Sequence, residues 1–168
     1  EVVVFDNFFR GKKENLISSL NSKKVKILEH GGDILQNDIL ENSLIGIDGV
    51  FHFAALWLLQ CHEYPESAFK TNVLGTFNVI NACRKKKIKK IVFSSSATVY
   101  GELNEPPFTE SMSVAPTSPY GRTKLIFEKI LQDWVNSNDA HRSVILRYFN
   151  PVGAHASGLL GEDPKDIP

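Results

Sequence analysis

Residues 91–101 (IVFSSSATVYG) and 120–124 (YGRTK) are the two segments around which the rest of this sequence is arranged. The apolar run at residues 91–93 is typical of a buried strand, and it places Ser96 just past the carboxyl end of that strand. Open α/β sheets bind their ligands at this end of the strands. The first segment therefore predicts a strand with a polar site at its end.

The second segment predicts the start of a helix. Ser118 or Thr117 can cap its amino end, and Pro119 suits its first turn. Tyr120 and Lys124 then share one face, where the ammonium and the positive end of the helix dipole both favour a phenolate for proton transfer. The same spacing is also common on amphipathic helices, where a ring and a lysine stem line the rim. The apolar positions at helical spacing are Ile126, Ile130, Leu131 and Trp134.

Other apolar runs predict further buried parallel strands at residues 2–5, 25–29, 47–55 and 143–147. The longest helical stripe spans residues 65–87 and is preceded by a shorter one at residues 12–21. Polar side chains at Asn72 and Thr76 interrupt the long stripe, and these groups need hydrogen-bond partners if they are buried. Strands alternating with helices indicate an α/β fold.

Ser96 followed by Tyr120-x-x-x-Lys124 resembles the catalytic triad of the short-chain dehydrogenase/reductase superfamily, in its extended branch, the NAD-dependent epimerase/dehydratase family. Residues 94–101 and 146–155 (LRYFNPVGAH) resemble in particular the family members that epimerise UDP-hexoses, and residues 157–164 (SGLLGEDP) extend the match. The resemblance runs through the whole chain and is weakest over residues 35–42. It implies a Rossmann-like, doubly wound parallel sheet.

The resemblance also implies an activity, namely NAD-dependent epimerisation at C4 of a UDP-hexose through a transient 4-keto sugar, as in the interconversion of UDP-glucose and UDP-galactose in galactose metabolism. Tyr120 would act on the C4 hydroxyl as a phenolate, Lys124 would hold the phenolate and the nicotinamide ribose, and Ser96 would position the oxygen. The implied substrate-binding residues are Ser96, Tyr120 and Asn150. No metal site is expected.

Residues that contact NAD are implied at several strand ends. Asp6 follows the first apolar run, where an acid accepts hydrogen bonds from the adenosine ribose hydroxyls and disfavours a 2′-phosphate. This favours NAD, while Arg10 in the following loop keeps NADP open, and an acid can also simply end a strand. The implied cofactor-binding residues are Asp6, Asn7, Asp33, Ile34, Phe53, Ala54, Ala55, Asn72, Lys124 and Phe149.

Two departures from the family pattern keep other functions open. Trp57 stands where the UDP-hexose epimerases usually carry a lysine that helps to hold NAD, which favours another nucleotide-sugar epimerase or dehydratase. Dehydratases, however, usually carry an acid pair where Ala97 and Thr98 stand here. The glycine-rich turn that carries the pyrophosphate of dinucleotides does not occur before residues 2–5, which favours a non-catalytic NAD-binding fragment.

The composition is that of a globular domain, with 168 residues, 42% of them hydrophobic, and zero formal net charge. Balanced charge gives no general attraction to nucleic acid or to a membrane surface. We expect residues 1–150 to form a partial NAD-binding Rossmann domain and residues 151–168 to begin the sugar-nucleotide-binding region. The first βα unit and most of the C-terminal substrate lobe would then lie outside the chain.

Two further expectations concern location and assembly. Cys61 and Cys83 lack metal-ligand spacing and a disulfide framework, which fits a reduced compartment. The sequence shows no signal peptide and no stretch long enough to span a bilayer, so a cytoplasmic location is the default expectation. The family resemblance implies a UDP-sugar as the small-molecule partner. It also implies a homodimer of the full-length chain through the helices at residues 65–87 and 120–136.

Overall fold

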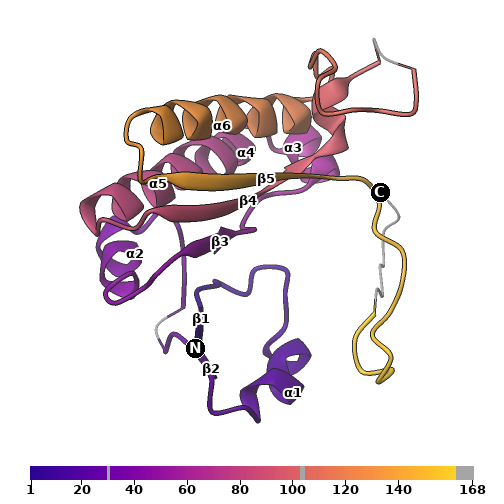
Figure 1. The fold of residues 1–168 in the computed structure, drawn as a ribbon. Helices are drawn as coiled ribbons and strands as arrows, with labels where there is room; N and C mark the ends of the chain where they lie inside the picture. Colours follow the sequence, from indigo (N-terminus) through magenta and orange to yellow (C-terminus); the bar gives the residue numbers. More distant parts are fainter. Residues whose placement is uncertain (30, 103–104, 162–168) are drawn as a thin grey trace.

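The computed structural model describes residues 1–29, 31–102 and 105–161 of an α/β protein (Figure 1). The strands are β1 (Val2–Val4), β2 (Val25–Ile27), β3 (Val50–His52), β4 (Lys90–Ser96) and β5 (Arg142–Tyr148). The helices are η1 (3₁₀, Lys13–Leu16), α1 (Ile17–Leu20), α2 (Asn37–Ser43), α3 (Leu58–Glu63), α4 (Pro65–Ala68), η2 (π, Phe69–Gly75), α5 (Thr76–Lys85), η3 (3₁₀, Ala97–Tyr100) and α6 (Pro119–Asn136). No helix in these three ranges has the length and apolar character to cross a membrane.

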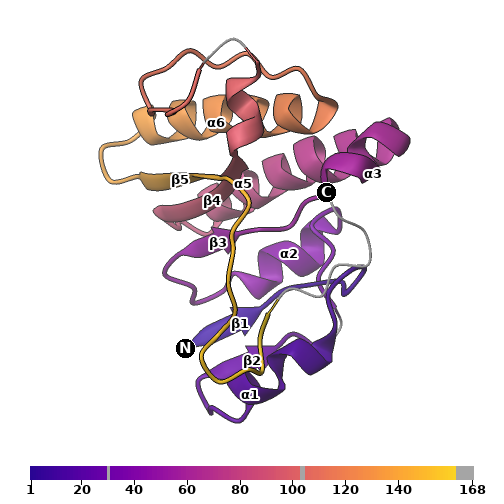
Figure 2. The same ribbon diagram turned by 90° about the vertical axis from the view of Figure 1, so that its right-hand side faces the viewer.

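All the strand pairs are parallel, which confirms the predicted class of fold, but the strands form two sheets, β1–β2 and β3–β4–β5. Viewed from the side, they lie in the order β2, β1, β3, β4, β5 (Figure 2). In the usual dinucleotide-binding order 3-2-1-4-5-6, these strands take positions 3, 2, 4, 5 and 6. Because β1 and β3 are not neighbours in that order, they do not hydrogen-bond to each other, and two sheets replace the predicted single sheet.

A cluster of apolar side chains packs the three-stranded sheet against α2, α5 and α6. Alternate residues of β4, among them Ile91 and Phe93, point into this cluster, where they meet Phe127 and Leu131 one helical turn apart on α6. Burying each such side chain stabilises the fold by about 1.5–3 kcal/mol. Helix α6 is therefore held firmly on β4. The opposite face of the sheet leaves Phe51 71% exposed.

Helix α6 begins where the sequence predicted. The Ser118 side chain accepts a hydrogen bond from the Gly121 amide at 3.0 Å, so Ser118 and not Thr117 is the cap. A Cβ on Gly121 would lie 2.8 Å from the Thr98 carbonyl oxygen, which shows how closely this first turn approaches η3. The close approach brings Tyr120 to the carboxyl end of β4.

The helix predicted over residues 65–87 is confirmed, since α4, η2 and α5 follow one another without a break from Pro65 to Lys85. Asn72 and Thr76, the two polar residues in the apolar stripe, both point inward and are almost fully buried, so both need hydrogen-bond partners. Thr76 Oγ1 donates to the Asn72 carbonyl at 2.9 Å and also bonds His52 Nε2 at 2.8 Å, so the buried hydroxyl is satisfied. Single π-turns often mark functional sites, and here the π-helix η2 carries Asn72.

Candidate active site

The three predicted catalytic residues meet at the carboxyl end of β4. Ser96 is the last residue of that strand, and Tyr120 lies in the first turn of α6 with Lys124 one turn further along. The Lys124 ammonium nitrogen lies 5.4 Å from the centre of the Tyr120 ring and donates to the Ser94 carbonyl at 2.7 Å. The structure therefore brings together a hydroxyl, a phenol and an ammonium from two elements of the chain.

Lys124 is an almost fully buried ammonium, 4% exposed. Burial lowers its pKa to about 8, and only the nearby Cys61 thiol acts in the opposite direction. Its nitrogen also lies 5.0 Å from the centre of the Phe93 ring, so aromatic faces replace much of its water. An ammonium has three donors, and the described residues supply one acceptor. Two donors thus remain for a ligand.

Tyr120 is half-buried. Burial raises the pKa of its phenol, the Cys61 thiol adds to this rise, and hydrogen bonding with Ser96 opposes it. The sequence predicted that Lys124 would lower this pKa. The net direction is nevertheless upward, because burial is the largest cause, and the ammonium donates to the Ser94 carbonyl. The effect of Lys124 on the phenol stays a prediction.

The Ser96 hydroxyl is oriented by its own backbone turn. Its oxygen accepts hydrogen bonds from the Thr98 amide at 3.2 Å and from the Thr98 hydroxyl at 3.0 Å, since Ser96 caps η3. With both lone pairs used, the Ser96 proton is the group left for a partner. Ser96 is thus set as a hydrogen-bond donor toward an oxygen beside Tyr120.

Asn72 fixes the loop that follows β3. Its Oδ1 accepts from the Leu56 amide at 2.7 Å, and its Nδ2 donates to the Leu56 carbonyl at 2.9 Å. The same Nδ2 reaches Cys61 Sγ at 3.3 Å and Thr123 Oγ1 at 3.4 Å, which links the loop to α6. Because these bonds occupy the amide, Asn72 positions backbone at the site, and its contact with a cofactor stays a prediction.

The other predicted cofactor residues lie at or near the carboxyl ends of the strands. Exposed side chains there include Asp6 and Asn7 after β1, Phe53 and Ala54 after β3, and Phe149 with Asn150 after β5. Ala55 is half-buried. Ile34 instead points into the core, and the Asp33 carboxylate accepts from the Leu35 amide at 2.8 Å. The adenine contact implied for Asp33 and Ile34 would therefore use their backbone and the second carboxylate oxygen of Asp33, which has no hydrogen bond to another described residue.

A buried ion pair that the sequence did not predict lies beside the site. Glu128, 1% exposed, accepts from Arg147 Nη2 at 2.7 Å and Nε at 3.0 Å, and from the Ser95 hydroxyl at 2.5 Å. Arg147 Nη1 also donates to the Tyr100 hydroxyl at 3.1 Å. The sequence did contain a sign of this pair. Glu128 follows Lys124 by one helical turn, which places a carboxylate on the buried side of α6, where it needs a partner.

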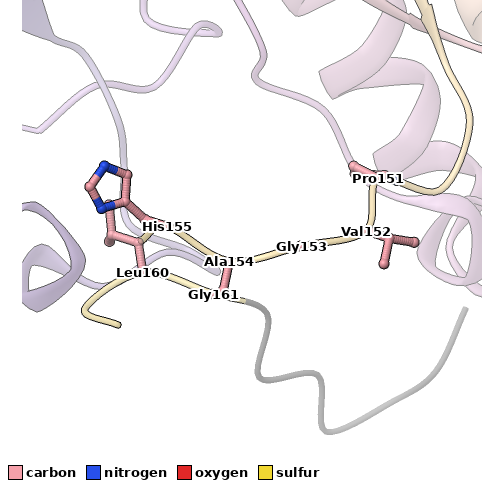
Figure 3. A pocket seen from close by; sticks show the side chains of 7 residues that line it. All are labelled: Pro151, Val152, Gly153, Ala154, His155, Leu160 and Gly161. Atoms are coloured by element: carbon pink, nitrogen blue, oxygen red, sulfur yellow. The ribbon is translucent and has the colours of Figure 1, made fainter. Parts of the chain in front are cut away.

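Residues 151–161 leave the sheet and fold back on themselves (Figure 1). They surround a hollow of about 460 Å³ lined by Pro151, Val152, Gly153, Ala154, His155, Leu160 and Gly161 (Figure 3). All seven lining residues are exposed, and His155 Nδ1 is hydrogen-bonded to Ser157 Oγ at 2.8 Å, in keeping with a structural histidine. Residues 162–168 lie outside the described residues. The assignment of 151–168 to sugar-nucleotide binding stays a prediction.

Known proteins resemble this chain over its whole length. The model of the NAD dependent epimerase/dehydratase family matches residues 1–165. A UDP-glucose 4-epimerase of Dictyostelium discoideum is 42% identical over 171 residues, covering 99% of this chain and 49% of the relative. The bacterial enzyme of the same name from Bacillus subtilis is 39% identical, covering 100% and 50%.

A solved structure agrees with these relatives. The crystal structure of UDP-glucose 4-epimerase from Bifidobacterium longum, in complex with NAD⁺ and UDP, has 40% identity and a TM-score of 0.90, covering 100% of this chain and 51% of that one. This chain spans about half the length of the curated relatives it matches. The match over nearly all its residues, together with the Ser96, Tyr120 and Lys124 arrangement, shows that the chain belongs to the NAD-dependent epimerase/dehydratase family.

Proposed function

We propose that this chain is the cofactor-binding and catalytic part of an enzyme that epimerises a UDP-hexose at C4, interconverting UDP-glucose and UDP-galactose in galactose metabolism. The observation that carries the proposal is the meeting of Ser96, Tyr120 and Lys124 at the end of β4, in a chain 42% identical to a protein named UDP-glucose 4-epimerase.

NAD is the cofactor in this proposal, and the residues at the strand ends fit it. Asp6 offers an exposed carboxylate for ribose hydroxyls, and the small side chain of Ala54 lets a ligand approach the backbone after β3. Phe53 and Phe149 are exposed aromatic rings suited to a flat ring system. Of the two donors that Lys124 keeps, one suits a ribose hydroxyl.

Each residue of the triad has a chemical role in this proposal. Tyr120 removes the proton of the C4 hydroxyl and later returns it, while Ser96 donates a hydrogen bond to the same oxygen. Bound NAD would supply the acceptor and donor for the C4 hydride. Because burial raises the pKa of Tyr120, the phenolate needs a hydrogen bond to its oxygen, and a free donor of Lys124 can provide it.

The test follows UDP-glucose by chromatography after incubation with NAD and the protein expressed from its complete reading frame. UDP-galactose should appear, and Tyr120→Phe should lose at least roughly 100-fold in rate, the usual contribution of a proton-transferring side chain. Thr123→Ser, on the same turn of α6, is the matched control. If NAD binds but no UDP-galactose forms, the substrate is a different one.

A second candidate is another nucleotide-sugar epimerase or dehydratase, and Trp57 is the observation in its favour. A dTDP-glucose 4,6-dehydratase from Streptomyces venezuelae, solved with NAD and TYD, shares 26% identity and a TM-score of 0.79. Against dehydration, Thr98 uses its hydroxyl to orient Ser96, and its neighbour Ala97 has no acid. Supplying dTDP-glucose and searching for a 4-keto-6-deoxy product separates the two candidates.

We also propose that the full-length protein is a cytoplasmic homodimer. Exposed apolar side chains gather on adjoining helical segments, with Phe69 and Leu74 on η2, Phe77 on α5 and Ile126 on α6. Both cysteines are unpaired thiols, as is usual in reducing compartments. Sedimentation analysis of Phe77→Glu tests the assembly: dissociation supports this surface, and an unchanged dimer excludes it.

A further inference from the structure

The loop after β1 reaches across to the loop after β3. The Arg10 guanidinium carbon lies 4.3 Å from the centre of the Trp57 ring, within the range of a cation–π contact. The two strands belong to different sheets and are not hydrogen-bonded to each other. This contact therefore joins the two halves of the fold at the edge where α/β sheets bind dinucleotides.

The loops after β1 and β3 also meet through side chains other than Arg10 and Trp57. Phe9, next to Arg10, and Leu56, next to Trp57, line a common cavity of about 250 Å³ with Gln60, Tyr64 and Ser67. The loop itself is ordered by two short turns, in which Asp6 Oδ1 accepts from the Phe8 amide at 2.7 Å and Asn7 Oδ1 accepts from the Phe9 amide at 3.0 Å. Arg10 thus leaves a fixed loop in the direction of Trp57.

The position of Arg10 bears on the choice of cofactor. In this architecture an acid after the second strand binds the ribose hydroxyls, and an arginine nearby accommodates the 2′-phosphate of NADP. Asp6 is the acid, and Arg10 is the arginine that follows it by four residues in the same loop. In the described part of the chain, however, Arg10 forms no ion pair with Asp6 and lies on Trp57 instead.

We propose that Trp57 sets the selectivity for NAD over NADP by holding the Arg10 guanidinium at the β3 side of the crevice, away from the ribose end at Asp6. The inference rests on the NAD binding proposed above and adds a selectivity residue to it. It also gives Trp57 a role, since its ring binds a cation from the opposite loop.

The test measures dissociation constants of NAD and NADP by calorimetry for the full-length protein. A cation–π contact changes an equilibrium constant by roughly 2- to 30-fold. We expect Trp57→Leu to release Arg10, tighten NADP binding and lower the NAD preference by a factor in the same range. Trp57→Phe keeps an aromatic face and should stay close to the parent protein. Trp57→Leu combined with Arg10→Met should restore the preference, because the released cation is gone.

A readout without cofactor checks the contact itself. Arg10→Met should alter the emission of Trp57, and the same change should have no effect on emission when Trp57 is already replaced by Leu. The second tryptophan of this sequence, Trp134, is buried and stacked on His141. The proposal is overturned if Trp57→Leu leaves the dissociation constant of NADP unchanged. It is also overturned if the tighter NADP binding persists when Trp57→Leu is combined with Arg10→Met. If the parent protein binds neither dinucleotide, the proposed function fails as well. Normal NAD binding with unaltered selectivity in every variant overturns the selectivity role alone.

Discussion

The buried pair of Glu128 and Arg147 allows a quantitative test of how the site is held together. Arg147 makes a two-pronged contact with the carboxylate, at 2.7 and 3.0 Å, and Ser95 donates a third hydrogen bond to it. Glu128 is almost completely buried, whereas the Arg147 side chain is 20% exposed. Arg147→Met removes the cation, keeps most of the apolar volume and leaves a charged group without its partner.

The expected destabilisation is large, because a buried carboxylate cannot recover its hydration in the folded protein. Removing one partner of a buried pair costs about 3–5 kcal/mol. The Arg147 to Tyr100 hydrogen bond at 3.1 Å is lost as well. Replacing both partners, in Glu128→Leu with Arg147→Met, should restore most of the stability, since well-packed apolar groups often equal a buried pair.

Urea unfolding of the full-length protein, followed by circular dichroism, measures these free energies. The matched control is the exposed pair of Lys70 and Glu66, one turn apart with a separation of 2.7 Å. Lys70→Met should cost less than about 1 kcal/mol, as exposed pairs do. A loss below about 1 kcal/mol in Arg147→Met would show that water reaches the carboxylate and that the pair is not a buried one.

Three further predictions concern titration and backbone conformation. Because the pKa of Lys124 falls from 10.5 to about 8 on folding, the stability measured by urea titration should rise between these pH values by about 3 kcal/mol, and Lys124→Met should remove the slope. Burial lowers the pKa of His52 from 6.5 to about 3, so stability should fall by about 5 kcal/mol as the pH drops through this range, and His52→Gln should flatten that fall. Gly101 has φ +66°, and an added Cβ would lie 2.0 Å from the Ala115 carbonyl oxygen, so Gly101→Ala should lower Tm by far more than Gly46→Ala, which has φ +74° and open space.

The five strands and the helices near residues 12–21, 65–87 and 120–136 could be predicted from local patterns, whereas α2 and η3 were not predicted. The apolar run at residues 91–93 became part of β4, and the helix starting at Pro119 has the predicted length and cap. These features depend on neighbouring residues, which the sequence displays directly. Helix α3 (Leu58–Glu63) was not predicted, because no side chain caps its start and its apolar residues continue without a break from the preceding loop.

The electrostatics of the site could not be predicted in the same way. The spacing of Tyr120 and Lys124 correctly placed both on one face of α6, but the phenol pKa is raised mainly by burial of the ring, which spacing does not reveal. The position of the ammonium is likewise set by the Ser94 carbonyl, 30 residues earlier in the chain. The contact between Arg10 and Trp57 is hidden for the same reason, since it joins two loops that follow different strands.

The three consecutive serines at the end of β4 each contact a different residue of α6. Ser94 offers its carbonyl to Lys124, Ser95 donates its hydroxyl to Glu128, and Ser96 faces Tyr120. The partners lie at intervals of four residues, so they share one face of the helix. A shift of α6 by one residue would break all three contacts together. The ion pair at Glu128 thus holds the helix in the one register that brings Tyr120 to Ser96, and its loss should disturb the catalytic geometry as well as the stability.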